Sequence, residues 1–158
     1  MFFTNCLFSK NLNQGTGAGG AISNNASGDK TSPVSLINCT LEGNVATIGC
    51  GIAQWEDATS NSITTLQNTI LYNPSGANYE VEDGAPEVIS AGGNLSGDAT
   101  LSAELTGTND QNDADPLFVD RDNYDYHLAA GSPCIDKGVA AGAPAVDIEG
   151  VALVPHQS

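Results

Sequence analysis

The sequence is short of basic residues. It has only four lysines and arginines, Lys10, Lys30, Arg121 and Lys137, against 19 acidic residues, and its net charge is −15. Such a charge repels the phosphate backbone of nucleic acids and the anionic surface of membranes, so we expect no nucleic-acid partner. No stretch approaches the ~20 apolar residues of a transmembrane helix, so we expect no membrane insertion.

A secretory leader and zinc-binding motifs are also missing. Residues 1–4 are too short for the apolar region of a signal peptide, so we expect either a mature chain whose leader was removed or a fragment of a longer protein. No Cys-x-x-Cys pair occurs, and His127 and His156 lie far from any cysteine, which argues against a zinc site. The four cysteines fit two disulfides and an oxidising compartment, which predicts a secreted or cell-surface protein.

Helix-forming residues are scarce as well. Lysine, arginine, methionine and glutamine are few, whereas glycine, with 18 residues, and asparagine, threonine and serine are common. This balance favours many short strands joined by turns. Hydrophobic residues make up 40% of the 158, which is enough for one folded domain with a continuous core.

The strongest pattern is a repeat of about 30 residues. Three segments resemble one another: Asn-Cys-Leu-Phe-Ser-Lys-Asn at 5–11, Asn-Cys-Thr-Leu-Glu-Gly-Asn at 38–44 and Asn-Thr-Ile-Leu-Tyr-Asn at 68–73. The first asparagine recurs after 33 and then 30 residues, and Gly-Gly-Ala-Ile at 19–22 is echoed by Gly-Cys-Gly-Ile at 49–52. One such repeat cannot bury its apolar side alone, so the repeats must stack.

Stacking predicts parallel strands about 4.8 Å apart, with asparagine and glycine at the corners. Asparagines at equivalent corners are then expected to form ladders along the stack. An antiparallel sandwich is the alternative, but it needs several hairpin dipeptides, and Asp83-Gly84 is the only one. We therefore predict an all-β fold, a right-handed parallel β-helix (a β-solenoid) with an irregular C-terminal cap.

These repeats resemble the right-handed parallel β-helix family. The C-terminal third is similar to one branch, the choice-of-anchor Q β-helix proteins of bacterial surfaces. That resemblance is carried by Asp-Pro-Leu-Phe-Val-Asp at 115–120, Asn-Tyr-Asp-Tyr-His-Leu at 123–128 and Gly-Ser-Pro-Cys-Ile-Asp-Lys-Gly at 131–138. Asp-Ile-Glu-Gly at 147–150 fits the start of the family's closing strand, and Val-Ala-Leu-Val-Pro replaces the rest. The resemblance implies a surface β-helix.

The chain divides into two parts of one domain. Residues 1–96 are predicted to form the coils, with loops at 24–33 and 56–62 and two short strands at 79–82 and 88–90. Residues 97–158 form the capping segment. In it, 97–114 is a polar loop with one helical turn, and 115–138 packs across the end of the stack. The other end has no cap in the sequence, so upstream coils or another copy are expected to cover it.

The acidic residues concentrate in the second half. Residues 1–79 carry a net charge of −2, and residues 80–158 a net charge of −13. Six aspartates are the candidate ligands for Ca²⁺: Asp110, Asp113, Asp115, Asp120, Asp122 and Asp125. Their spacing departs from the EF-hand loop, and capping of loop backbone by the same side chains is the competing interpretation.

The candidate ligand site is Trp55 with Glu56 and Asp57. An exposed tryptophan beside carboxylates can stack on a sugar ring, whereas a half-buried one closes a loop. No catalytic residues are predicted, because the motifs of the polysaccharide-cleaving β-helix enzymes are absent and His127 lies in a strand-like segment.

The cysteines offer two pairings. Cys6 and Cys39 follow equivalent asparagines, so they are expected to stack within the ~5 Å that a disulfide accepts, with Cys50–Cys134 as the second bridge. Stacked free thiols in the core are the alternative.

We therefore expect a non-catalytic extracellular or cell-surface structural module. Its expected partners are copies of itself stacked along the axis or upstream β-helix coils. In the first case the apolar tail at 151–154 would connect copies into a filament. The alternatives are a polysaccharide-binding or polysaccharide-degrading β-helix protein, or a Ca²⁺-dependent adhesin.

Overall fold

The computed structural model describes residues 1–153 as strands joined by turns, with two short 3-10 helices. The strands are β1 (Phe2–Thr4), β2 (Leu7–Ser9), β3 (Ile22–Ala26), β4 (Thr31–Ile37), β5 (Thr40–Glu42), β6 (Ile52–Glu56), β7 (Asn61–Gln67), β8 (Ile70–Tyr72), β9 (Tyr79–Asp83), β10 (Glu87–Ser90), β11 (Leu95–Ser96), β12 (Phe118–Asp120) and β13 (Asp125–Leu128). The 3-10 helices are η1 (Ala99–Leu101) and η2 (Arg121–Asn123). Within the described residues no helix is long and apolar enough to cross a membrane.

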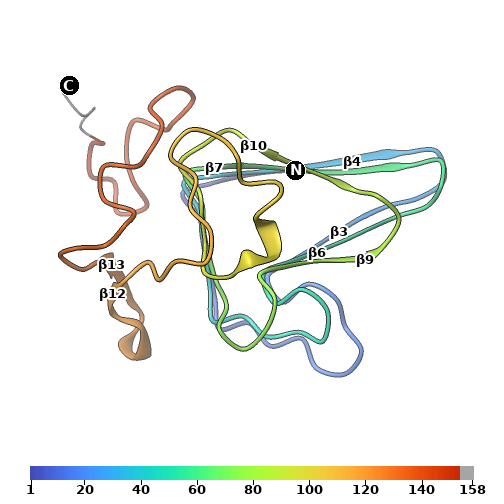
Figure 1. Cartoon of the computed structure of the whole chain (residues 1–158), viewed down its shortest axis with the longest axis horizontal. Helices are drawn as coiled ribbons and strands as arrows, with labels where there is room; N and C mark the ends of the chain where they lie inside the picture. Colours follow the sequence, from blue (N-terminus) through green and yellow to red (C-terminus); the bar gives the residue numbers. More distant parts are fainter. Residues whose placement is uncertain (154–158) are drawn as a thin grey trace.

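Three parallel sheets form the body of the molecule. Their strand orders are β1-β4-β7-β10, β2-β5-β8-β11 and β3-β6-β9. Neighbouring strands in a sheet are three apart in the chain, so the chain passes through the sheets in turn. We call each passage a coil. Figure 1 looks along this stack, and the strands of each sheet lie over one another. The fold is therefore all-β with parallel sheets, as predicted.

The strand register reproduces the sequence repeat. Phe2 pairs with Ser35, 33 residues later, and Thr31 pairs with Asn61, 30 residues later. The two spacings read from the sequence are thus the lengths of the first two coils. The predicted strands at 79–82 and 88–90 are β9 and β10.

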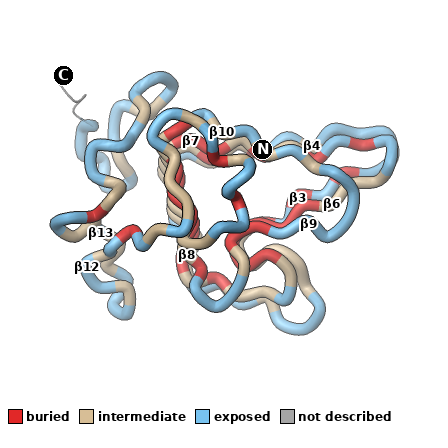
Figure 2. Tube along the Cα trace, in the orientation of Figure 1, coloured by how far each residue is buried: buried red, intermediate tan, exposed pale blue. Residues whose placement is uncertain are grey.

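The core consists of aliphatic residues stacked coil on coil. Leu36 pairs with Leu66 and Leu41 with Leu71, and all four side chains are fully buried. β4 alternates buried and half-buried positions along its second half, as expected for a strand with one face on a core. Each such leucine contributes about 1.5–3 kcal/mol on burial. The buried segments in Figure 2 line the interior of the coils.

Asparagines shape one corner of every full coil. Asn5, Asn38 and Asn68 all have left-handed backbone conformations, with φ of 54°, 53° and 49°. Asparagine adopts this conformation more readily than other side-chain-bearing residues, because its short polar group bonds locally. The corners therefore stack, as the sequence predicted.

The loops are shorter than predicted. Residues 24–26 and 31–33 belong to β3 and β4, and residue 56 and residues 61–62 belong to β6 and β7. The reason is a buried layer of polar side chains, because such side chains in a sequence resemble those of a loop. Asn24 Nδ2 donates to the hydroxyl of Thr64 at 3.1 Å, and the buried Gln54 donates to Ser62 at 3.0 Å.

The capping segment also differs from the prediction. Residues 97–114, not 115–138, cover the end of the coil interior, because they carry the fully buried Leu101 and the buried Leu105. Residues 115–128 pack instead on the outside of the sheet β2-β5-β8-β11, where β12 and β13 form an antiparallel pair. In Figure 1 this pair lies beside the stack.

Candidate functional site

The two ends of the stack differ in how their interiors are covered. At the first coil, the rings of Phe3 and Phe8 meet edge to face with centroids 5.2 Å apart, and both are only partly buried. Their counterparts in the next coil, Leu36 and Leu41, are fully buried because they have a coil on each side. β1, β2 and β3 are each the outer strand of their sheet, so this end is open.

The opposite end is closed by the chain itself. Leu101 and Leu105 belong to the hydrophobic core cluster and lie over the last coil. Gln111 extends the sheet beyond β11: its N–H donates to the carbonyl of Asn94 at 2.8 Å, and its carbonyl accepts from Ser96 at 2.9 Å. This end therefore offers neither an open interior nor a free β11 edge.

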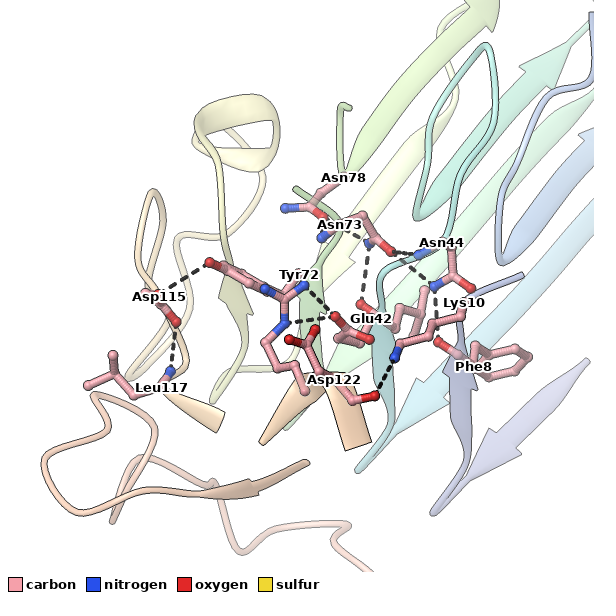
Figure 3. Close-up of polar contacts among 12 residues, drawn as sticks. Phe8, Lys10, Glu42, Asn44, Tyr72, Asn73, Asn78, Asp115, Leu117 and Asp122 are labelled. Atoms are coloured by element: carbon pink, nitrogen blue, oxygen red, sulfur yellow. Dashed lines mark hydrogen bonds and ion pairs between the residues drawn. The ribbon is translucent and has the colours of Figure 1, made fainter. Parts of the chain in front are cut away.

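An asparagine ladder runs through the stack between these ends. Asn44 Oδ1 accepts from the backbone N–H of Asn11 at 3.1 Å and from Asn11 Nδ2 at 2.7 Å. Asn73 Oδ1 accepts the same two groups of Asn44, at 2.8 and 3.0 Å. Asn78 Oδ1 accepts them from Asn73, at 2.8 and 2.9 Å. Asn44, Asn73 and Asn78 follow one another in Figure 3.

The ladder has a direction and ends on a carboxylate. Every amide oxygen faces the preceding ladder residue, and the last backbone N–H, that of Asn78, donates to Asp98 Oδ2 at 2.8 Å. Burial acts to raise the pKa of Asp98, but hydrogen bonds from Thr100, Asn78 and Ser96 outweigh it and lower that pKa. A charged acceptor thus closes the donor end of the ladder.

A second asparagine contact lies at the outer corner, formed by Asn5, Asn38 and Asn68, where the buried Oδ1 of Asn5 has no hydrogen-bond partner. Asn68 Nδ2 donates to Asn38 Oδ1 at 3.0 Å, while Asn68 Oδ1 accepts from the N–H of Val139 at 2.7 Å. At the first coil, Asn5 Nδ2 donates to the carbonyl of Val146 at 2.9 Å. The segment after β13 therefore runs beside the stack and contacts this corner at Asn5 and at Asn68.

A buried ion pair attaches the outer hairpin, which consists of β12, η2 and β13, to the coils. Glu42, on β5, is 1% exposed, and Arg121 donates to its Oε1 through both Nε and Nη2. The guanidinium of Arg121 lies 4.6 Å from the centroid of the Tyr72 ring. Tyr72 in turn donates its hydroxyl to Asp115 at 3.2 Å, as Figure 3 shows. No pattern in the sequence indicated that Glu42 would be buried.

A pocket of about 460 Å³ lies between this hairpin, the outer corner and the segment at 147–149. Its wall includes Tyr124, Tyr126, Asp125, Asp147 and Glu149. Lys10 places its ammonium 3.9 Å from the centroid of the Tyr124 ring. Carboxylates beside aromatic rings suit a neutral hydroxylated ligand or a cationic one.

His127 joins two walls of the pocket. Its Nδ1 lies 2.6 Å from Asp125 Oδ1 and its Nε2 lies 3.2 Å from Glu149 Oε2. The hydrogen bond with Asp125, followed by that with Glu149, raises the pKa of His127. His127 thus links the hairpin to the segment at 147–149.

No family model, curated protein or solved structure matches this chain. The functional argument therefore depends on the geometry of the described residues.

The six candidate Ca²⁺ ligands do not converge. Among residues 1–153, no group of three or more histidine, cysteine or acidic side chains is arranged to hold a metal. Asp110 accepts from Ser90, Gly107 and both nitrogens of Asn94, which pins the turn after β10.

The other five aspartates lie along the outer hairpin and the loop before it. Asp120 accepts from Asn123, and Asp125 from His127. Asp113 has a left-handed backbone, and the carbonyl of Asp122 accepts from Lys10. Asp115 accepts from Tyr72 and from the N–H of Leu117. The carboxylates of Asp115, Asp120 and Asp125 accept from backbone N–H groups, as in the capping interpretation, whereas the features of Asp113 and Asp122 belong to their backbone.

The predicted ligand site lies at the end of β6 and just after it. Trp55 is partly buried on β6, next to Glu56, whose carboxylate accepts from the N–H of Ser62 at 2.6 Å. Asp57 accepts from the N–H of Gly28 at 2.8 Å, and hydrogen bonds from the Ser60 side chain and then from the N–H groups of Gly28 and Thr59 lower its pKa to about 2. Both carboxylates are thus engaged in holding the connection between β6 and β7.

The predicted disulfides are absent, and the four cysteines are free thiols. Cys39 lies beside Cys6 as predicted, but its thiol turns to the carbonyls of Ile37 and Phe3, at 3.4 and 3.6 Å. Burial is the main cause that raises its pKa to about 11. Cys50 donates to the carbonyl of Ala46 at 3.5 Å. The alternative of stacked free thiols describes the first pair.

Proposed function

We propose that the protein is a right-handed parallel β-helix with a non-catalytic, structural role as the closing end of a longer β-helical rod. The observation that carries this proposal is the contrast between its two ends. Leu101 and Leu105 cover the last coil, while Phe3 and Phe8 are left partly exposed on the first. A terminal unit of a repeat protein needs one face that ends the core and one that continues it.

Location outside the cell is part of the proposal. It is supported by the resemblance of residues 115–138 to surface β-helix proteins. Because the four cysteines are free thiols, disulfides do not support an extracellular location. Fractionation of the native host with an antibody to this chain is the direct test.

The structural role is tested by damaging the closed end. We expect Leu101→Asp with Leu105→Asp to expose the apolar interior of the last coil and convert a monomer into aggregates, measured by sedimentation velocity. The matched control is Leu117→Asp with Val119→Asp, at positions that are 42% and 53% exposed. A double variant at 101 and 105 that stays a folded monomer would remove the basis of the proposal.

The pocket supports a second candidate function, binding of a polysaccharide. Its wall combines the Tyr124 ring, 62% exposed, with the carboxylates of Asp125, Asp147 and Glu149. Titration with a panel of neutral and amino-sugar oligosaccharides, followed by NMR, tests it. Loss of binding in Tyr124→Ala but not in Trp55→Ala assigns the ligand to the pocket, and the reverse result assigns it to residues 55–57.

A further inference from the structure

We infer that the open end binds one further parallel coil whose corner residue donates hydrogen bonds to Oδ1 of Asn11, and that this coil does not come from a second copy of this chain. The inference rests on the proposed function and names the partner of the open end. Its chemistry is that of the repeat itself: an asparagine at the corner, aliphatic residues inside and strands parallel to β1, β2 and β3.

The asparagine ladder supplies the first argument. Asn44, Asn73 and Asn78 each present Oδ1 to two donors of the preceding ladder residue, with distances of 2.7–3.1 Å. Asn11 is the first member, and among the described residues nothing donates to its Oδ1. Because the pattern is directional, the missing donors are the backbone N–H and the side-chain amide of an asparagine in a preceding coil.

This direction excludes a second copy in either orientation. Head-to-tail stacking would bring Asn11 Oδ1 toward the end that carries Asp98, where a carboxylate acceptor already closes the ladder. It would also bring the open coil against Leu101, which occupies that interior. Two first coils meeting face to face would each present Asn11 Oδ1 as an acceptor, while the N–H and Nδ2 of each Asn11 already donate to Asn44. Neither copy then supplies the donor pair of the ladder, and an acceptor left without a donor costs free energy once water is excluded.

The edges and the core supply the second argument. β1, β2 and β3 each have a neighbour on one side only, so each has a row of unpaired backbone groups facing the open end. Phe3 and Phe8 lie between them, partly exposed. A coil with aliphatic residues at the positions of Leu36 and Leu41 would pair all three edges and bury both rings.

Charge opposes this contact at one corner of the open end only. The strands β1, β2 and β3 carry no acidic residue: the first in the chain is Asp29, and Lys10 is the one basic residue before it. Acidic residues from later in the chain lie beside the first coil, because Asp125, Asp147 and Glu149 line a pocket together with Asn5 and Leu7. Repulsion from these carboxylates acts at that corner and is screened by salt.

The test adds a coil taken from the protein. A copy of residues 31–60 followed by a copy of 31–33 is placed before Met1, which continues the register in which Ser35 lies over Phe2. The copied Asn44 then lies over Asn11. We expect the backbone amides of β1 and β2 to exchange with solvent about tenfold more slowly than in the original chain. The matched variant carries Asn44→Asp in the added copy only, and we expect it to lose most of this protection.

Three results would overturn the inference. An added coil that leaves exchange in β1 and β2 unchanged means that the open end does not accept a coil. Equal protection in the Asn44→Asp variant means that the ladder does not select the partner. Stacked oligomers of the original chain in sedimentation velocity mean that the partner is a second copy. None of these depends on Leu101 and Leu105, so they are separate from the test of the closed end.

Discussion

Arg121 and Glu42 lie 79 residues apart in the sequence and form an ion pair in which two guanidinium nitrogens share one carboxylate oxygen. The other oxygen of Glu42, Oε2, is buried without a hydrogen-bond partner. The carboxylate therefore depends on Arg121 for its compensation, and the outer hairpin is held on β5 through this contact.

Removing the guanidinium should destabilise the protein strongly. We expect Arg121→Met to lower the free energy of unfolding by about 3–5 kcal/mol, because it leaves a buried carboxylate unpaired. The double variant Glu42→Met with Arg121→Met should recover most of this loss, since it leaves no buried charge. Urea unfolding of the set measures both values, and equal stabilities of the single and double variants would contradict the account.

The ladder of Asn11, Asn44, Asn73 and Asn78, which we call the inner ladder, should also contribute to stability. Asn44 is fully buried, and its amide bonds to Asn11, Asn73 and the carbonyl of Phe8. We expect Asn44→Ala to cost about 1–3 kcal/mol for each buried group left unsatisfied. Asn61→Ala, at an exposed position on β7, is the control and should change stability by less than about 0.5 kcal/mol.

The contact of His127 with Glu149 should weaken as pH rises. Asp125 and Glu149 raise the pKa of His127 in the folded protein. The contribution of His127 to stability is therefore fully present below its unfolded pKa and is lost as pH rises through its folded pKa. NMR titration should give a pKa above about 6.5. Glu149→Gln should lower it, and amides at 147–149 should exchange faster above it. A titration at the unperturbed value would show that the contact does not persist.

The thiols should be reduced and largely unreactive in the folded state. Burial raises the pKa values of Cys39 and Cys134 to about 11, so little thiolate forms at pH 8. Alkylation of the native protein should spare both. After unfolding without reductant, intact mass should show four modified cysteines. Two or four unmodified residues under those conditions would establish the disulfides that the sequence suggested.

Chelation should leave the stability unchanged. The aspartates at 110, 115, 120 and 125 already accept hydrogen bonds from neighbouring residues. A cation that bound only the folded chain would raise its melting temperature. We expect coincident melting curves in EDTA and in excess Ca²⁺, and a rise with Ca²⁺ would restore the metal prediction.

The sequence by itself determined the body of the fold. The Asn-Cys and Asn-Thr spacings predicted the coil lengths because one passage through three short strands needs about 30 residues, and each asparagine marks a left-handed corner. The last residue of each repeat segment, Asn11, Asn44 or Asn73, builds the inner ladder. These features are periodic because each coil repeats them, and they can therefore be recognised in the sequence alone.

Only the tertiary structure decided what the irregular segments do. Nothing periodic indicates that Leu101 and Leu105, and not residues 115–138, cover the core, or that Glu42 is buried beneath Arg121. The same holds for the thiol of Cys39, whose position beside Cys6 was predictable but whose direction was not. These contacts join segments used once in the chain, and their energies depend on where the folded backbone places each side chain.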